Sequence, residues 1–275
     1  MDARLLERQR LAHYQLAYSK RIVTLADAAR CINRFGFCWL FAPRDRKLEL
    51  PSLFEAVKGK RDAHIDDWDA DSDKVWAWKN DLPAAKRAYY GKAFAGKPVF
   101  ISLKMLPYAI AALGEKDSVR AYKHGALLYD AKRVYDALAQ FGAQPTQTLK
   151  RSAGFVGKEG NTRYHRALDE LQTKMIVAAM GATNEGAAWP SQIFDLVAHW
   201  FENETRQAKQ IETQSARCAL VEQYLKTVLA APPEALARLF QIPRPELKIL
   251  LDEMIRAKKI RMENNWVFRK SKIEI

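Results

Sequence analysis

One acidic run in the sequence has the residue types of a metal site but the wrong spacing. The run Asp66-Asp67-Trp68-Asp69-Ala70-Asp71-Ser72-Asp73 resembles the start of a calcium loop. Counted from Asp67, the sixth position is Ser72 instead of glycine, and the twelfth is Trp78 instead of a bidentate glutamate. We therefore expect a solvated loop whose Asp or Ser caps a helix over residues 74–81, because acidic groups are favourable at a helix start.

A second segment has the spacing of a phosphate-binding loop. Gly91-Lys-Ala-Phe-Ala-Gly96-Lys97 matches G-x-x-x-x-G-K, but Pro98 stands where Ser or Thr would hold magnesium. A phosphate loop also needs a helix directly after it, whereas residues 98–102 are β-branched and aromatic and predict a strand. The segment is better interpreted as a β-hairpin over residues 88–102 with a basic tip.

Charge is the strongest general signal in the chain. The 275 residues include 45 Lys or Arg and 32 Asp or Glu, a formal charge of +13. The surplus is almost even, since residues 1–120 hold 22 basic and 15 acidic groups and residues 121–275 hold 23 and 17. Such a surplus is typical of nucleic-acid binders. We therefore expect a contact surface for double-stranded DNA that extends over several parts of the chain.

The composition also excludes several classes of protein. No run of about 18 apolar residues is present, so we expect no membrane contact. Three cysteines are too few and too scattered for a disulfide framework or a zinc site, and we expect no metal and no cofactor. The charged first helix, over residues 1–20, does not have the pattern of a signal peptide. The expected protein is a cytoplasmic monomer associated with the nucleoid.

Helix and turn signals repeat one plan along the chain. Each unit has three helices, the second of them short, followed by a two-stranded hairpin, which is the plan of a winged helix-turn-helix. In the first unit, Thr24 and Asp27 predict a capping box at the start of a helix over 24–35. In the first unit we expect helices over 24–35, 51–58 and 74–81 and the hairpin 88–102, followed by a helix over 103–113 capped by Ser102. In the second unit we expect helices over 122–141, over 147–153 and from Thr162, and a hairpin over 175–197. In the third unit we expect helices over 218–229, 234–240 and from Pro243, and a hairpin over 260–269 that turns at Asn264-Asn265.

The expected fold class is mainly α with short β-hairpins (α+β), built of tandem winged helix-turn-helix modules. We expect an N-terminal helix and first module over residues 1–116, a second module over 117–202, and a linker and third module over 203–275. Periodicity predicts the last unit best. The polar stretch 203–216 is the expected linker.

Basic residues gather at the third helix of the second unit, which in a winged helix can enter the major groove. The DNA-binding candidates are Lys150, Arg151, Lys158, Arg163, His165 and Arg166 in the second unit, with Arg244 and Lys248 in the third. Core packing is the expected fate of most aromatic residues near 35–41. Trp39, close to a run of basic residues, is the candidate for stacking an extruded base.

The layout resembles the AlkZ/YcaQ-like winged-helix DNA glycosylases. The segments that carry this resemblance are Leu25-Ala-Asp-Ala-Ala-Arg-Cys-Ile-Asn-Arg-Phe-Gly, Leu50-Pro-Ser-Leu-Phe-Glu-Ala-Val, Val75-Trp-Ala-Trp, Val99-Phe-Ile-Ser-Leu-Lys-Met-Leu-Pro, Pro145-Thr-Gln-Thr-Leu-Lys and Tyr164 to Met175. The resemblance covers most of residues 20–270, supports the count of three modules, and implies hydrolysis of the N-glycosidic bond of an alkylated or crosslinked purine in duplex DNA.

The resemblance also implies a Gln-x-Gln or Gln-x-Asp motif after the first helix, to position or activate water. This sequence has no glutamine from Arg34 to Leu48. The only carboxylate nearby is Asp45, which becomes the candidate catalytic base. Three hypotheses follow: a damage-recognition protein or divergent glycosylase, a non-enzymatic transcription regulator, which would usually be a dimer, and a set of winged helices that contact only proteins.

Overall fold

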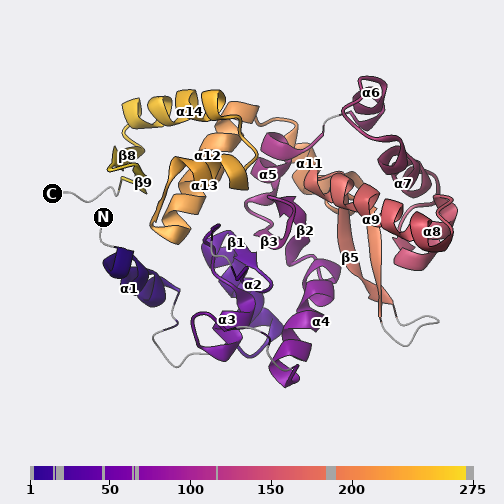
Figure 1. The fold of residues 1–275 in the computed structure, drawn as a ribbon, viewed down its shortest axis with the longest axis horizontal. Helices are drawn as coiled ribbons and strands as arrows, with labels where there is room; N and C mark the ends of the chain where they lie inside the picture. The colour runs from indigo at the N-terminus through magenta and orange to yellow at the C-terminus, as the bar shows by residue number, and fades with distance from the viewer. Residues whose placement is uncertain are drawn as a thin grey trace.

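The computed structural model describes residues 3–14, 16, 22–44, 47–63, 65, 68–115, 117–183 and 190–270 (Figure 1). This part of the chain repeats one order of elements three times: a helix, a short strand, a short helix, a longer helix and two strands. The first repeat is α2 (Leu25–Phe35), β1 (Phe37–Trp39), α3 (Leu53–Lys58), α4 (Ala70–Ala84), β2 (Ala88–Phe94) and β3 (Lys97–Ser102). The second is α7 (Tyr129–Phe141), β4 (Gln144–Pro145), α8 (Thr146–Ser152), α9 (Gly157–Thr173), β5 (Val177–Thr183) and β6 (Ser191–Leu196).

The third repeat is α12 (Thr213–Val228), β7 (Ala230–Ala231), α13 (Pro233–Leu239), α14 (Arg244–Arg256), β8 (Ile260–Glu263) and β9 (Trp266–Arg269). Other helices precede or join the repeats: α1 (Ala3–His13), α5 (Leu106–Leu113), α6 (Ser118–Lys123), α10 (Val197–Trp200) and α11 (Glu202–Ala208). The fold is therefore mainly helical with small sheets. No helix among the described residues has the length and apolar character needed to cross a membrane.

Each repeat closes a small antiparallel sheet in the same way. The strand orders are β1-β3-β2, β4-β6-β5 and β7-β9-β8, so the short first strand always pairs with the last strand of the hairpin. In the first sheet the register sets Phe37 opposite Ile101 and Trp39 opposite Val99. The common topology shows that the three repeats are one structural unit used three times.

Local sequence signals explain several of these elements. Thr24 and Asp27 form the predicted capping box of α2, and Asp69 caps α4 by accepting a hydrogen bond from the backbone N–H of Ser72. The predicted hairpin over 88–102 is confirmed as β2 and β3. Asn264 and Asn265 adopt φ values of 48° and 60°, which are the left-handed angles that a two-residue turn between β8 and β9 requires.

Some predicted boundaries were wrong. The helix expected over 122–141 is two helices, α6 and α7, because Gly125 adopts a φ of 72° between them. Thr162 is inside α9, which begins at Gly157 and carries Glu159 in its first turn, where the helix dipole favours an acidic group. Ser102 ends β3 and does not cap α5, which begins at Leu106. The predicted linker 203–216 is largely helical, because it contains α11 and the start of α12. The predicted helix over residues 1–20 can be compared only in part, because residues 1, 2, 15 and 17–20 lie outside the described residues.

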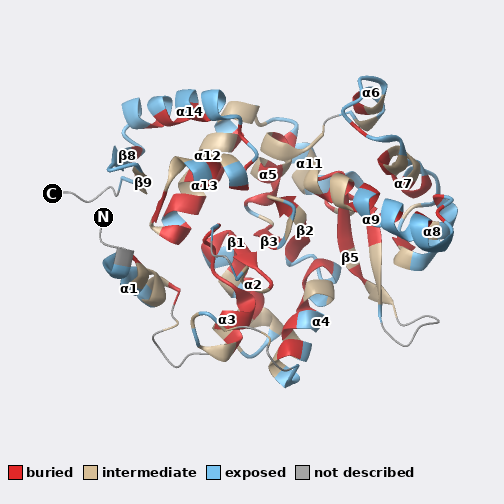
Figure 2. Cartoon of the chain, viewed as in Figure 1, coloured by how far each residue is buried: buried red, intermediate tan, exposed pale blue. Residues whose placement is uncertain are grey.

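The first sheet is buried on both faces. Cys38, Tyr90 and Phe100 point into a core shared with α2, α4 and the second repeat. Phe37 and Trp39 point into another core, shared with α12, α13 and the rest of the third repeat. Figure 2 shows β1 and β3 in the buried colour at the centre of the molecule. The alternation of side chains along a strand thus joins one repeat to the other two.

Aromatic and polar contacts tie the third repeat to the first. The Phe240 ring lies edge-on to Phe94 and Phe37, with centroids 5.2 and 6.2 Å away. The hydroxyl of Thr227 donates to the carbonyl of Phe35 at 2.6 Å, and the side-chain amide of Gln241 donates to the carbonyl of Ala93 at 3.0 Å. These two hydrogen bonds give the carbonyls of Phe35 and Ala93 a partner where the third repeat covers them.

A buried ion network fastens the N-terminal helix across the same junction. Arg10 of α1 donates to the carbonyls of Val228 and Ala230 in the third repeat, at 2.9 and 2.8 Å. Arg61 in the first repeat bonds Glu7 of α1 at 2.7 Å and Glu49 at 2.9 Å. Because these guanidinium groups are largely buried and paired, α1 is held against both repeats.

We expect Phe240→Ala to lower the free energy of unfolding by about 3–5 kcal/mol, because it removes a large ring from the core between two repeats. Denaturant unfolding followed by tryptophan fluorescence and circular dichroism measures the change. The control is Phe141→Ala, whose ring is 59 % exposed and whose loss should cost less than about 0.5 kcal/mol. Equal losses of stability in the two variants would contradict the burial of Phe240 between the first and third repeats.

Candidate nucleic-acid interface

The predicted basic residues of the second repeat lie on α8 and α9 and differ in what they contact. Arg151, Lys158 and Arg166 are exposed and form no ion pair with any residue that the structure describes. The ammonium group of Lys150 donates to the side-chain oxygen of Asn161 at 3.1 Å. The exposed three are therefore the side chains free to meet a phosphate.

Arg163 has a structural partner. Its guanidinium donates to both carboxylate oxygens of Asp130, at 2.8 and 2.6 Å, and so fastens α9 to α7. The hydrogen bond from Arg163 lowers the pKa of Asp130, and Asp130 in turn raises the pKa of Arg163. A contact between Arg163 and DNA would have to compete with this bidentate pair.

Arg244 and Lys248 of the third repeat are one turn apart on α14. They border a groove of about 320 Å³ whose apolar lining includes Leu247, Leu251 and Met262. Lys248 pairs with Asp252 at 3.3 Å, whereas Arg244 has no ion partner among the described residues. The ion pair with Asp252 thus neutralises part of the positive charge of this helix.

The structure places Trp39 in the core, which corrects the expectation of an exposed stacking surface. Its side chain is 1 % exposed, and its indole N–H faces the carbonyl of Leu48 at 3.4 Å. Both neighbours in β1 are buried as well, because the sheet is covered on its two faces. No ring face of Trp39 is open to a base. Asp45 lies outside the described residues.

Aromatic rings are exposed elsewhere in the first repeat. Trp76 is 43 % exposed and stacks with Phe41. Trp68 is 52 % exposed and lies edge-on to Trp76, with the two ring centroids 5.8 Å apart. The Lys79 ammonium lies 3.5 Å from the centroid of Trp76, and desolvation lowers the pKa of this lysine to about 8. Lys79 already covers part of the Trp76 face.

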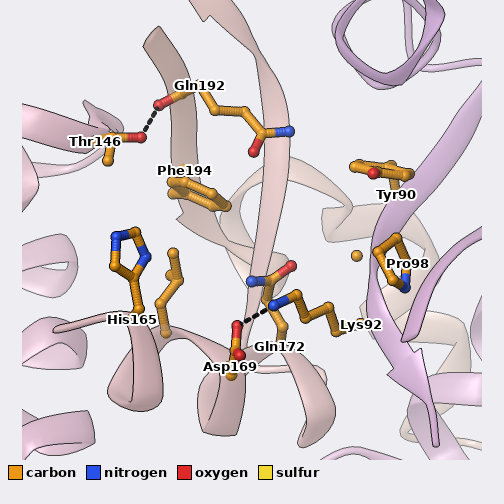
Figure 3. Close-up of a pocket in the computed structure, with 11 residues that line it drawn as sticks. Tyr90, Lys92, Pro98, Thr146, His165, Asp169, Gln172, Gln192 and Phe194 are labelled. Carbon is orange, nitrogen blue, oxygen red and sulfur yellow. Dashed lines mark hydrogen bonds and ion pairs between the residues drawn. The ribbon is translucent and has the colours of Figure 1, made fainter. Parts of the chain in front are cut away.

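A pocket of about 180 Å³ lies at the junction of the first and second repeats. We call it the seam pocket (Figure 3). One stripe of α9 forms one side of it, with His165, Leu168, Asp169 and Gln172 at helical spacings of three and four. The remaining lining residues are Tyr90, Gly91, Lys92 and Pro98 from the first hairpin and Thr146, Gln192 and Phe194 from the second repeat.

Polar contacts fix most of the groups that line the seam pocket. Lys92 of β2 forms an ion pair with Asp169 of α9 at 2.5 Å, which joins the two repeats. The Thr146 hydroxyl donates to the carbonyl of Gln192 at 2.9 Å, and the Gln192 amide faces the side-chain oxygen of Asn80 at 3.4 Å. Gln172 is 6 % exposed, and its amide is not among the fully buried polar groups that lack a hydrogen-bond partner.

Among the residues that line this pocket, the sequence predicts a functional role only for His165, as a DNA contact, whereas Gly91 and Pro98 fall in the segment interpreted as a hairpin. Asp169 and Gln172 share one face of α9 with the apolar Leu168, and polar residues beside an apolar one on that face are the signal that could have drawn attention to them. Tyr90 and Phe194 gave no signal, because aromatic residues in predicted strands are usually core. Across the described ranges, no cluster of three or more His, Cys, Asp or Glu side chains could hold a metal ion.

Two comparisons with known proteins both point to AlkZ. The family described as AlkZ related matches residues 22–241. Among solved structures, the Streptomyces sahachiroi DNA glycosylase AlkZ is similar, with a TM-score of 0.53 and 12 % sequence identity. The match covers 92 % of this chain and 66 % of that one, so the chain spans just under two thirds of the length of that structure. A search of curated proteins gave no match.

We expect Arg163→Gln to lower the melting temperature at neutral pH and to have little effect near the acid limit. The pKa of Asp130 is lowered in the folded protein, so its ion pair stabilises the fold above the unfolded value of about 3.9. That contribution is lost as the pH falls through the lower folded value. Thermal unfolding from about pH 7 down to about pH 2.5 measures the difference. Arg166→Gln is the control, and a loss that does not depend on pH would contradict the assignment.

Proposed function

Because the chain belongs to the AlkZ-related family, we propose that it binds duplex DNA and recognises alkylated or crosslinked sites in it. We propose further that the three repeats are tandem winged helix-turn-helix modules, over residues 1–116, 117–202 and 203–275. The order of helices and strands in each repeat and the identical strand order of the three sheets support this interpretation. We infer a monomer, because three modules in one chain supply the extended surface that a dimer would otherwise provide.

The exposed basic side chains of α8 and α9 are the observation that carries the proposal. In a winged helix the third helix can enter the major groove, and α9 is the third helix of its repeat. One side of α9 packs on β2 of the first repeat, so only its outer side can face DNA. Arg151, Lys158 and Arg166 lie in this region, are exposed and have no ion partner among the described residues, as phosphate contacts require.

Lys150, Arg163, His165, Arg244 and Lys248 complete the proposed contact set with smaller roles. Arg163 and Lys248 are engaged in ion pairs within the protein, and Lys150 is bonded to Asn161. Their charges still add to the attraction that steers DNA toward this surface.

Hydrolysis of the N-glycosidic bond is the finer part of the proposal. The segment after α2 is buried strand, with Phe37, Cys38 and Trp39 all in the core, so none of them can present a catalytic group to solvent. Asp45 is the carboxylate we propose as the base that would activate water. A transcription regulator remains the alternative, and it would prefer a sequence over a lesion.

We expect Lys158→Gln combined with Arg166→Gln to weaken duplex binding uniformly across sequences. It should also reduce the slope of log affinity against log salt by about 2, since each lost phosphate contact removes about 0.9. Fluorescence anisotropy at several salt concentrations measures both effects. Arg30→Gln, on α2 with a side chain 72 % exposed, is the matched control. An unchanged slope in the double variant would place the DNA on another surface.

We expect the protein to bind a duplex with alkylated purines more tightly than the intact duplex, and we expect any abasic sites it forms to depend on Asp45. The Asp45→Asn variant should reduce strand breaks after alkali treatment to the background level while leaving binding unchanged. Excision that persists in this variant would contradict the role of Asp45. Absence of excision by the natural sequence would remove the enzymatic part of the proposal. Preference for one intact sequence would favour the regulator.

A further inference from the structure

One side-chain hydrogen bond crosses the turn between the second and third helices of the second repeat. The ammonium group of Lys150, in the last turn of α8, donates to the side-chain oxygen of Asn161 on α9 at 3.1 Å. Because an ammonium group can only donate, this contact fixes which end of the Asn161 amide is its oxygen. Asn161 is exposed, and its amide N–H groups bond no residue that the structure describes. The pair therefore presents N–H donors to a molecule that approaches it.

The first half of α9 carries Asn161 clear of the first repeat. Lys92 of the first repeat bonds Asp169 and Thr173, which both lie in the second half of the helix. The inner side of the first half is buried at Gly160, where a Cβ atom would lie 3.2 Å from the backbone of Phe155. The N-terminal residues of such a helix contact base edges in a helix-turn-helix protein. Asn161 thus has the position of a residue that reads a base.

Basic side chains lie on either side of Asn161 along the same helix. Lys158 is three residues before it and Arg166 is five residues after it, and both are exposed. Phosphate contacts from such residues fix the position of a helix on the duplex, whereas contacts to base edges supply specificity. Asn161 and Lys150 therefore lie between the proposed phosphate contacts, where a base edge would be presented to them.

The donors of this pair match guanine. In the major groove guanine presents two acceptors, N7 and O6, whereas adenine presents one acceptor and one amino donor. An asparagine alone suits adenine, because its amide offers one donor and one acceptor. The oxygen of Asn161 is bonded to Lys150, so an adenine amino group that approached it would lie close to the ammonium charge. Guanine instead offers one acceptor to the Asn161 amide and one to the ammonium group.

We propose that Lys150 and Asn161 together read the N7 and O6 atoms of one guanine in the major groove of duplex DNA. The proposal rests on the proposed function, which places α9 in that groove. A guanine alkylated at N7 has lost one of the two acceptors, so the guanine that is read is an intact base beside the damaged site. The pair gives the DNA-binding surface a preference for guanine in the flanking sequence.

The test compares guanine with 7-deazaguanine, which lacks the N7 acceptor. Two duplexes have the same repeated G·C sequence, and one of them has every guanine replaced, so the comparison holds in every register. Fluorescence anisotropy with the whole protein should show at least about fivefold weaker binding to the 7-deazaguanine duplex, the lower limit for a lost bidentate contact. An A·T duplex and its 7-deazaadenine form should bind with closely similar affinities.

Substitutions of the two residues should change these ratios in different ways. Asn161→Ala deletes the amide donor and Asn161→Asp replaces it with an acceptor, so both should remove the difference between the two G·C duplexes. Lys150→Met frees the oxygen of Asn161, so this variant should bind the A·T duplex more tightly than its 7-deazaadenine form. The lost charge weakens binding to every duplex alike and cancels in the ratio.

Asn203→Ala is the matched control. Asn203 is exposed on α11, and its oxygen also accepts a hydrogen bond from a basic side chain, that of Arg206 at 2.6 Å. This variant should keep the guanine preference of the natural protein. Melting temperatures establish that all four variants are folded.

Equal binding of the natural protein to the guanine and 7-deazaguanine duplexes would overturn the proposal. A difference that persists in both Asn161 variants would overturn it as well, and a Lys150→Met variant that keeps the guanine preference would contradict the role of the lysine. Salt-dependent duplex binding without the guanine preference would overturn this inference alone. A protein that binds no duplex would overturn the proposed function together with it.

Discussion

A three-stranded sheet with no solvent-facing side holds this protein together. Side chains that alternate along β1 and β3 enter two different cores, one shared with the second repeat and one with the third. Both faces of the sheet stay covered only while the second and third repeats remain packed against it. Phe240 and Arg10 act on the same junction, one by filling it and the other by bonding backbone carbonyls there. The relative position of the repeats is therefore a consequence of burial.

This arrangement limits which surfaces remain free to bind. The third helix of the first repeat packs on β5 of the second, and the third helix of the second repeat packs on β2 of the first. Each of these helices thus loses one side to the neighbouring hairpin. What remains is the outer side of α9 with Lys158 and Arg166, and a seam where the two repeats meet and enclose a pocket around Gln172. The outward position of Lys158 and Arg166 and the position of this pocket both follow from the packing of α4 on β5 and of α9 on β2.

Local features of the fold could be predicted from the sequence, and long-range ones could not. The capping box at Thr24 and the turn at Asn264 depend on residues a few positions apart, so their signals are complete in the sequence. The burial of Trp39 depends on side chains about 180 to 230 positions later, which no local pattern reveals. For the same reason the pocket around Gln172 was missed: its walls, Tyr90 and Phe194, come from two hairpins that are distant in sequence and meet only after folding.

A crystal structure of the protein bound to duplex DNA tests most directly whether α8 and α9 form the DNA-binding surface. We expect the phosphates to follow α8 and α9, with Arg151, Lys158 and Arg166 in contact. A duplex bound on a different face of the protein, away from α8 and α9, would contradict this expectation.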